Sequence, residues 1–278
     1  MHIRQLLHQV LNGMEFCVTG MPTGLLTLDE RTSGLHPGIV IIASRPFMGK
    51  TALAIDIANH AALNLTRKVS YFTFNESEVR IASRFLYQGA GIPFWKNRES
   101  INDEDRANLE STSHAMNATK ISIIAGSKLS QEDICKYIHT YHDCDEPGLV
   151  VIDDIQSLVK ATARKHDPTA SDFSSTLAAL ERLAEEIGVP ILILSDLPRS
   201  IEKRKDRRPV FRDLEKAGLL KFHANLVIFL FREGFYDPDI GDSGKIECMV
   251  GKNSNGGIGT VFLEFCQNSG RFLDCQCA

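Results

Sequence analysis

The chain has 278 residues and a formal net charge of −4, with 43% hydrophobic and 24% charged residues. These proportions are ordinary for a folded globular protein and exclude wholesale disorder. The acidic balance excludes a protein held to nucleic acid by bulk positive charge, so nucleic-acid binding would have to come from a local basic patch. No apolar run approaches the roughly 18 residues that a membrane-spanning helix needs, and we expect no membrane partner.

The N-terminal segment predicts a helix but no secretory signal. Apolar residues from Ile3 to Met14 recur at helical spacing, which predicts an amphipathic helix over residues 2–14. This helix either packs on its own domain or docks on a neighbouring subunit. The seven cysteines are scattered without a CxxC pair, so we expect reduced thiols in a cytoplasmic protein.

From residue 38 onward, short apolar runs alternate with longer segments of helical pattern. The predicted strands are residues 38–44, 69–74, 121–126, 149–154, 190–196, 224–233, 245–252 and 259–266. The predicted helices are residues 51–65, 79–91, about 130–142 and 174–188. Strands without polar alternation are buried on both faces, which predicts an α/β fold with a mostly parallel sheet and helices on both sides. The last two strands, joined through the Asn255-Gly256-Gly257 turn, are expected to add an antiparallel edge. We expect one α/β domain over residues 20–278 after an N-terminal arm over residues 1–19.

The segment SRPFMGKT, between a buried strand and a helix, carries the clearest chemical signal. It nearly fits the phosphate-binding pattern GxxxxGK[ST], with Ser44 where the first glycine usually stands. In such a loop, main-chain N–H groups at a helix N-terminus bind phosphate oxygens, Lys50 neutralises the β- and γ-phosphates, and the Thr51 hydroxyl reaches Mg²⁺. The nucleotide-binding candidates are Ser44, Arg45, Pro46, Phe47, Met48, Gly49, Lys50 and Thr51.

An apolar strand that ends in two carboxylates, LVVIDD, supplies the second half of such a site. A carboxylate at this place holds Mg²⁺, and we assign that role to Asp153 together with Thr51. Asp154 is expected to point to the opposite face of the strand. The expected ligands are therefore ATP and Mg²⁺.

Several longer segments make the sequence similar to one known family. They are TGLLTLDERTSGL (23–35), ASRPFMGKT (43–51), VVIDDIQSL (150–158), GVPILILSDLPRSIEKRKDRRPVFRDLEKAG (188–218) and VGKNSNGGIGTV (250–261). The chain resembles the C-terminal, RecA-like motor domain of the DnaB family of hexameric replicative DNA helicases, without the family's N-terminal collar domain.

The resemblance implies a fold, an activity and partners. It implies a RecA-like P-loop ATPase that hydrolyses ATP at subunit interfaces of a ring and translocates 5′ to 3′ on single-stranded DNA. The helix over residues 2–14 would dock on the next subunit of a homo-oligomer, a hexamer in this family, and a helicase loader or primase would be a partner. The host would be a bacterium, a phage or a plasmid.

This chain departs from the family's pattern at catalytic positions. Where the resemblance places a glutamate that activates water, the chain has Asn75, and loss of a general base costs about 10²–10⁴ in rate. Glu76 follows and would face away on a regular strand, but could substitute if the strand has already ended. Where the resemblance places a sensor glutamine, the chain has Asp196. Gln156 matches the family and is expected to orient the site.

Two positions near the end of the chain are implied to act on the neighbouring subunit. Lys252 matches a family lysine and joins the nucleotide-binding candidates. Ser254 stands where the family has an arginine finger, whose loss is worth about 10³–10⁵ in rate.

A basic segment over residues 199–216 is the candidate DNA-binding surface. Its eight basic residues outnumber Glu202, Asp206, Asp213 and Glu215, which leaves a local net charge of +4. Binding of phosphate and a merely solvated loop are both open at this point. The DNA-binding candidates are Arg199, Lys203, Arg204, Lys205, Arg207, Arg208, Arg212, Lys216 and the family-matching Gly218. Arg164 and Lys165 fall in a second candidate loop.

Three functions fit these residues. The first is an ATP-driven DNA helicase motor, which the resemblance favours. The second is a hydrolysis-impaired relative that binds nucleotide and regulates or joins another ring, which the substitutions favour. The third is a RecA-like ATPase with a task other than unwinding. All three require nucleotide binding.

Overall fold

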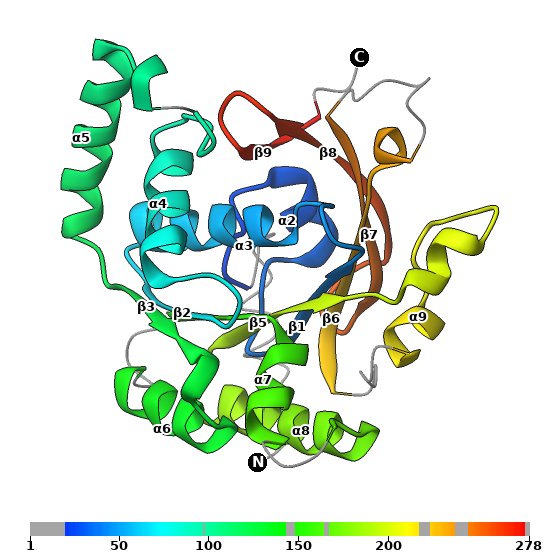
Figure 1. Cartoon of the computed structure of the whole chain (residues 1–278). Coiled ribbons are helices and arrows are strands. Elements are labelled where there is room, and N and C mark those ends of the chain that lie inside the picture. Colours follow the sequence, from blue (N-terminus) through cyan, green and yellow to red (C-terminus); the bar gives the residue numbers. More distant parts are fainter. Residues whose placement is uncertain are drawn as a thin grey trace, which may run out of the picture.

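A nine-stranded sheet with strand order β3-β2-β4-β5-β1-β6-β7-β8-β9 forms the centre of the molecule (Figure 1). The structure, a computed structural model, describes residues 20–96, 98–142, 148–163, 167–216, 223–236 and 244–275. The strands are β1 (Gly38–Ser44), β2 (Lys68–Thr73), β3 (Ile121–Ala125), β4 (Gly148–Asp153), β5 (Pro190–Asp196), β6 (Ala224–Phe231), β7 (Lys245–Asn253), β8 (Gly259–Cys266) and β9 (Arg271–Asp274).

The sheet is parallel from β3 to β6 and antiparallel from β7 onward, which confirms the predicted mixed architecture. Every residue of β1 is buried, as the continuous run GIVIIAS predicts for a strand covered on both faces. By contrast, β8 alternates between exposed and buried residues along most of its length and borders solvent on one side. The antiparallel edge is one strand wider than expected, because the four-residue β9 pairs with β8.

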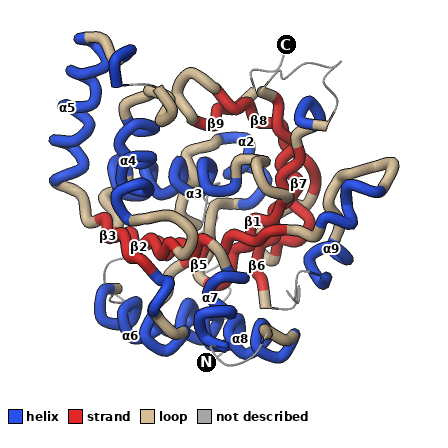
Figure 2. The backbone as a smooth tube through the Cα atoms, viewed as in Figure 1, coloured by secondary structure: helices blue, strands red, loops and turns tan. Residues whose placement is uncertain are grey.

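Helices cover both faces of the sheet (Figures 1 and 2). One face carries α2 (Leu26–Thr32), α3 (Lys50–Asn59) and α4 (Glu78–Gly89), while the other carries α6 (Gln131–Tyr141), α7 (Ile155–Ala163) and α8 (Ala170–Ile187). The short α9 (Phe211–Lys216) lies beside β6 and β7, and α5 (Asp103–Asn117) projects beyond α4 without a single buried residue. Two apolar cores result, one on each side of the sheet.

Local sequence signals explain where several helices begin and end. The Ser130–Asp133 pair forms a capping box at the start of α6, and Gly188 ends α8 in the left-handed conformation (φ 67°). A second capping box, between Thr169 and Asp172, starts α8 four residues before the expected position 174. The predicted helix over 51–65 is α3 followed by a π-helical turn, His60–Asn64.

The first helix and the last strand of the described domain are joined by one carboxylate. Asp274 in β9 accepts hydrogen bonds from the main-chain N–H groups of Leu26 (2.8 Å) and Thr27 (2.9 Å) at the start of α2. The Thr27 hydroxyl donates to the same side chain at 2.5 Å. Asp274 therefore caps a helix 248 residues away in sequence, which has no cap of its own.

Some predictions lie outside the described residues. These are the helix over residues 2–14, the loop residues Arg164 and Lys165, and Gly218. Within the described ranges, no helix is both long and apolar enough to cross a membrane. Cys135, Cys248 and Cys266 are free thiols.

Candidate functional site

The loop between β1 and α3 has the backbone of a phosphate-binding turn. β1 ends at Ser44 and α3 begins at Lys50, with Gly49 at φ 95° as the residue before the helix. A Cβ atom at Gly49 would lie 3.0 Å from the ring of Phe272, so both the conformation and the space require glycine. The N-terminus of α3 therefore faces the carboxyl edge of the sheet, where an anion is stabilised by free N–H groups.

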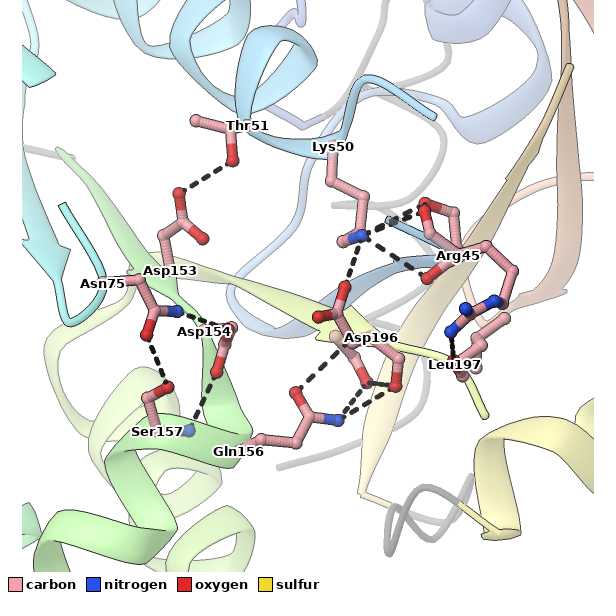
Figure 3. A network of polar contacts seen from close by, with 12 residues as sticks. Arg45, Lys50, Thr51, Asn75, Asp153, Asp154, Gln156, Ser157, Asp196 and Leu197 are labelled. Carbon is pink, nitrogen blue, oxygen red and sulfur yellow. Dashed lines mark hydrogen bonds and ion pairs between the residues drawn. The ribbon is translucent and has the colours of Figure 1, made fainter. Parts of the chain in front are cut away.

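Lys50 directs its ammonium group back along this loop (Figure 3). The Lys50 side chain is only 9% exposed, and its Nζ lies 3.2 Å from Ser44 Oγ, 3.3 Å from the Ser44 carbonyl and 3.3 Å from the Arg45 carbonyl. It also forms an ion pair with Asp196 Oδ1 at 2.7 Å. The predicted phosphate-neutralising charge thus lies inside the loop rather than in bulk solvent.

Thr51 and Asp153 meet as the sequence predicts for a magnesium site. The Thr51 hydroxyl donates to Asp153 Oδ2 at 3.0 Å, and the buried Tyr71 hydroxyl donates to the same oxygen at 2.8 Å. Burial raises the pKa of the Asp153 carboxyl above its ordinary value, while the hydroxyls of Tyr71 and Thr51 lower it. A hydroxyl and a carboxylate beside a phosphate loop are hard oxygen ligands, so this donor set fits Mg²⁺.

Asp154 turns away from Asp153, as expected, and joins a separate network (Figure 3). Its Oδ2 accepts from Asn75 Nδ2 at 2.8 Å, and its Oδ1 accepts from the Ser157 main-chain N–H at 2.8 Å. The Ser157 hydroxyl donates to Asn75 Oδ1 at 3.2 Å. Asn75 is thereby fixed against a carboxylate that comes from the neighbouring strand end.

Glu76 follows the end of β2, which stops at Thr73, so the condition for it to turn toward the site is met. Its carboxylate nevertheless forms ion pairs with Arg80 (2.5 Å) and Arg84 (3.0 Å) on α4. Both guanidinium groups also lie over the ring of Phe94, at 5.1 Å and 4.3 Å. The Glu76 carboxylate is therefore held in ion pairs with Arg80 and Arg84 at the edge of the site.

Gln156 holds the end of β5 in place, which agrees with an orienting role. Its amide nitrogen donates to Ser195 Oγ (2.9 Å) and to the Asp196 carbonyl (3.1 Å). Its amide oxygen accepts from the Asp196 N–H at 3.3 Å. These bonds fix the main chain of Asp196 and leave its side chain directed at Lys50 (Figure 3).

The remaining loop residues differ in what their side chains can offer. Arg45 donates to the Leu197 carbonyl at 2.6 Å and pairs with Glu202 at 2.9 Å, which ties the loop to the basic segment. Met48 is buried in the core, whereas Phe47 is 82% exposed. At Met48, therefore, only the main chain is available for the predicted nucleotide contacts, whereas the side chain of Phe47 is accessible as well.

The basic segment divides into exposed cations and cations held in ion pairs. Arg204 bonds the buried Asp213 at 3.0 Å, and Arg208 bonds Glu247 through two contacts of 2.5 and 2.8 Å. Arg207 is half-buried over the ring of Tyr236. The exposed members are Arg199, Lys203, Lys205 and Arg212. The eight candidates are thus not equivalent, since Arg204 is paired within the segment and Arg208 joins the segment to β7.

Lys252 and Ser254 lie far along the sheet from the phosphate loop. Ser254 bonds Asn225 near the start of β6, and Lys252 pairs with Val227, opposite the middle of β1, whereas the loop follows the end of β1. Within one chain, these residues are therefore not part of the site. Their predicted role at the nucleotide of a neighbouring subunit stays a prediction.

Sequence reasoning missed Tyr71 and Arg84 as neighbours of the site. Tyr71 lies in β2 next to β4, and the parallel register Thr73↔Asp153 lets its hydroxyl donate to Asp153, the predicted magnesium ligand. A hydroxyl-bearing aromatic in a strand that is otherwise apolar was the available signal. Arg84 carries no such signal, because its partner Glu76 lies eight residues earlier in a loop.

Comparisons with known proteins point to one family. Residues 20–274 match the family described as "DnaB-like helicase C terminal domain". The replicative DNA helicase DnaB of Geobacillus stearothermophilus is 30% identical over 270 residues, which is 96% of this chain and 59% of that protein. The replicative DNA helicase DnaB of Buchnera aphidicola subsp. Baizongia pistaciae is 33% identical over 259 residues, 92% of this chain and 56% of that protein. The chain spans less than three-fifths of the length of these two relatives.

Solved structures agree with the predicted RecA-like fold. A structure described as an ATPase domain superimposes with a TM-score of 0.90 at 26% identity, covering 99% of this chain and 98% of that one. A DnaB-like replicative helicase studied with its interactions with primase gives a TM-score of 0.87 at 26% identity, with 99% and 67% coverage. The chain belongs to the family of DnaB-like helicase C-terminal domains.

Proposed function

We propose that this chain is an ATP-binding motor domain that translocates on single-stranded DNA as part of a ring. The observation that carries the proposal is the convergence of Lys50, Thr51 and Asp153 around the Gly49 turn. A lysine, a hydroxyl and a carboxylate at a helix N-terminus are the groups that recognise a magnesium nucleoside triphosphate. Membership in the DnaB-like family supports the choice of ATP-driven DNA translocation among the tasks of such sites.

Each group has a separate role in the proposed reaction. Main-chain N–H groups at the start of α3 bind phosphate oxygens, and Lys50 neutralises their charge. Thr51 and Asp153 would hold Mg²⁺, which supplies charge neutralisation between the phosphates when it is bound. Gln156 holds the main chain of Asp196 at the end of β5 in a fixed position.

The rate of ATP hydrolysis distinguishes the candidate functions, because Asn75 stands where the family resemblance places a catalytic glutamate. Asn75 offers no basic carboxylate, and the carboxylates nearest to it in sequence and space are Glu76, paired with Arg80 and Arg84, and Asp154. A turnover of about 1–10³ s⁻¹ would be ordinary for an enzyme. Steady-state ATP hydrolysis with and without single-stranded DNA, in the full chain and in Lys50→Ala, tests the function directly.

DNA binding and ring formation complete the proposal. The exposed cations of the 199–216 segment would bind DNA phosphates. Lys252 lies on β7, two strands away from β1, and would contact the nucleotide of a second copy in a ring closed by the helix over residues 2–14. A hexamer, a helicase loader or primase partner and a cytoplasmic location follow from the same proposal.

Two results would contradict it. If the unchanged chain hydrolyses ATP no faster than Lys50→Ala does, the proposed ATPase activity is wrong. An unchanged elution volume on size-exclusion chromatography after deletion of residues 1–16 would remove the ring-closing role of the N-terminal helix. Strong nucleotide binding without DNA-stimulated turnover would instead favour the hydrolysis-impaired alternative.

A further inference from the structure

The Lys50 ammonium is already fully coordinated by oxygen atoms of its own chain. A lysine ammonium has three N–H donors. Here it lies within 3.3 Å of two carbonyls and one hydroxyl of the loop, and 2.7 Å from Asp196 Oδ1. The shortest of these contacts is the one with the charged carboxylate. A phosphate oxygen that approaches Lys50 must therefore compete with Asp196.

The main chain keeps Asp196 beside the loop. Ser44 and Asp196 are register partners across β1 and β5, and the Leu197 N–H donates to the Ser44 carbonyl at 2.9 Å. Gln156 bonds both the carbonyl and the N–H of Asp196. The carboxylate can rotate toward water, since it is 48% exposed, but its backbone stays next to the phosphate loop.

The charge of Asp196 acts most strongly on the last phosphate of a bound nucleotide. A phosphate-loop lysine reaches the β- and γ-phosphates, so a carboxylate in contact with that lysine lies one atom layer from them. A γ-phosphate adds negative charge at this point, whereas a diphosphate ends before it. Two like charges about 6 Å apart in a partly exposed site weaken binding by about tenfold.

We propose that Asp196 sets the nucleotide preference of this site by disfavouring a nucleoside triphosphate relative to the diphosphate. The inference rests on the proposed nucleotide site and goes beyond it, because it assigns a specificity role to one side chain. Asp196 competes for Lys50 with either ligand but repels only the terminal phosphate of the triphosphate, and an uncharged amide in its place removes the repulsion and weakens the competition.

Asp196 can be changed without loss of the fold. Its carboxylate is 48% exposed, and in its absence two carbonyls and one hydroxyl of the loop still accept hydrogen bonds from the buried Lys50 ammonium. The bonds with Gln156 involve only the main chain of Asp196, so they persist in a variant. Asp196→Asn keeps the size of the side chain and removes its charge. Asp196→Gln introduces the residue that the family resemblance implies at this place.

The experiment measures two affinities for each variant. Isothermal titration calorimetry with ADP and with the β,γ-imido analogue of ATP, both in excess Mg²⁺, gives the ratio of the two dissociation constants. We expect Asp196→Asn and Asp196→Gln to strengthen binding of the triphosphate analogue by about tenfold or more, and that of ADP by less than about threefold. Glu185→Gln, an exposed carboxylate on α8, is the matched control and should leave the ratio unchanged.

The outcomes separate this inference from the proposed function. If both ligands bind but the ratio is the same in the unchanged chain and in the Asp196 variants, the inference is wrong and the nucleotide site stands. A parallel gain for both ligands would also overturn it, because a loosened structure would act on both. If the unchanged chain and the Asp196 variants bind neither ligand, the proposed nucleotide site fails and the inference fails with it.

Discussion

The salt dependence of DNA binding distinguishes the exposed cations of the 199–216 segment from those held in ion pairs. Each phosphate contact to a single strand adds about 0.7 to the slope of log Kobs against log salt concentration. Among the side chains of this segment that the structure describes, four cations are exposed: Arg199, Lys203, Lys205 and Arg212. Four contacts at that value correspond to a slope of about 2.8. Replacement of all four by alanine should therefore make the slope shallower by about 2.8.

Fluorescence anisotropy of a labelled oligothymidine, titrated with protein at a series of salt concentrations, gives this slope. The matched control replaces Arg106, Lys136 and Arg182, which are exposed cations on α5, α6 and α8. The control should retain the original slope. An unchanged slope in the fourfold variant, or an equal loss in the control, would refute the assignment of DNA binding to this segment.

Three further predictions concern the site and its surroundings. Burial raises the pKa of Asp153, and Mg²⁺ requires its ionised form, so magnesium-dependent nucleotide binding should weaken as the pH falls from neutral. Tyr71→Phe removes a hydrogen bond that favours the ionised form. Binding titrations across about pH 5–8 should therefore show the loss at higher pH in this variant than in the unchanged chain. Asp213→Ala removes a buried carboxylate that holds Arg204, so urea titration should show a free energy of unfolding lower by about 2–4 kcal/mol, and a change below about 0.5 kcal/mol would contradict this. Asn75→Glu places a carboxylate against Asp154 and should raise ATP turnover less than the double variant with Asp154→Asn; equal rates would argue against the contact.

The buried strands and the phosphate loop were predictable because their signals are local. A run such as GIVIIAS predicts a strand that is buried on both faces of a sheet, and Gly49-Lys50-Thr51 predicts a turn followed by a helix. Helix α5 was missed because DEDRANLESTSHAMN has no apolar stripe, and accordingly none of its residues is buried. The four-residue β9 gives too short a pattern for any prediction.

The partners of the site residues depend on strand register, which the sequence did not reveal. Asn75 and Asp154 are 79 residues apart, and their contact follows from the pairing of β2 with β4. Likewise, the family resemblance implied a sensor position for Asp196, but its ion pair with Lys50 required the β1–β5 register. The division of the basic segment was equally hidden, because Arg208 bonds Glu247 on another strand.

Asp274 has a consequence for how the domain assembles during synthesis. Its carboxylate caps α2, near the start of the described domain, from the last strand. Helix α2 cannot acquire this cap until nearly the whole chain has left the ribosome, and contacts of such high sequence separation form late in folding. Shortened translation products that end before β9 should therefore carry an uncapped α2 and an exposed edge strand β8, a combination that invites pairing with other chains.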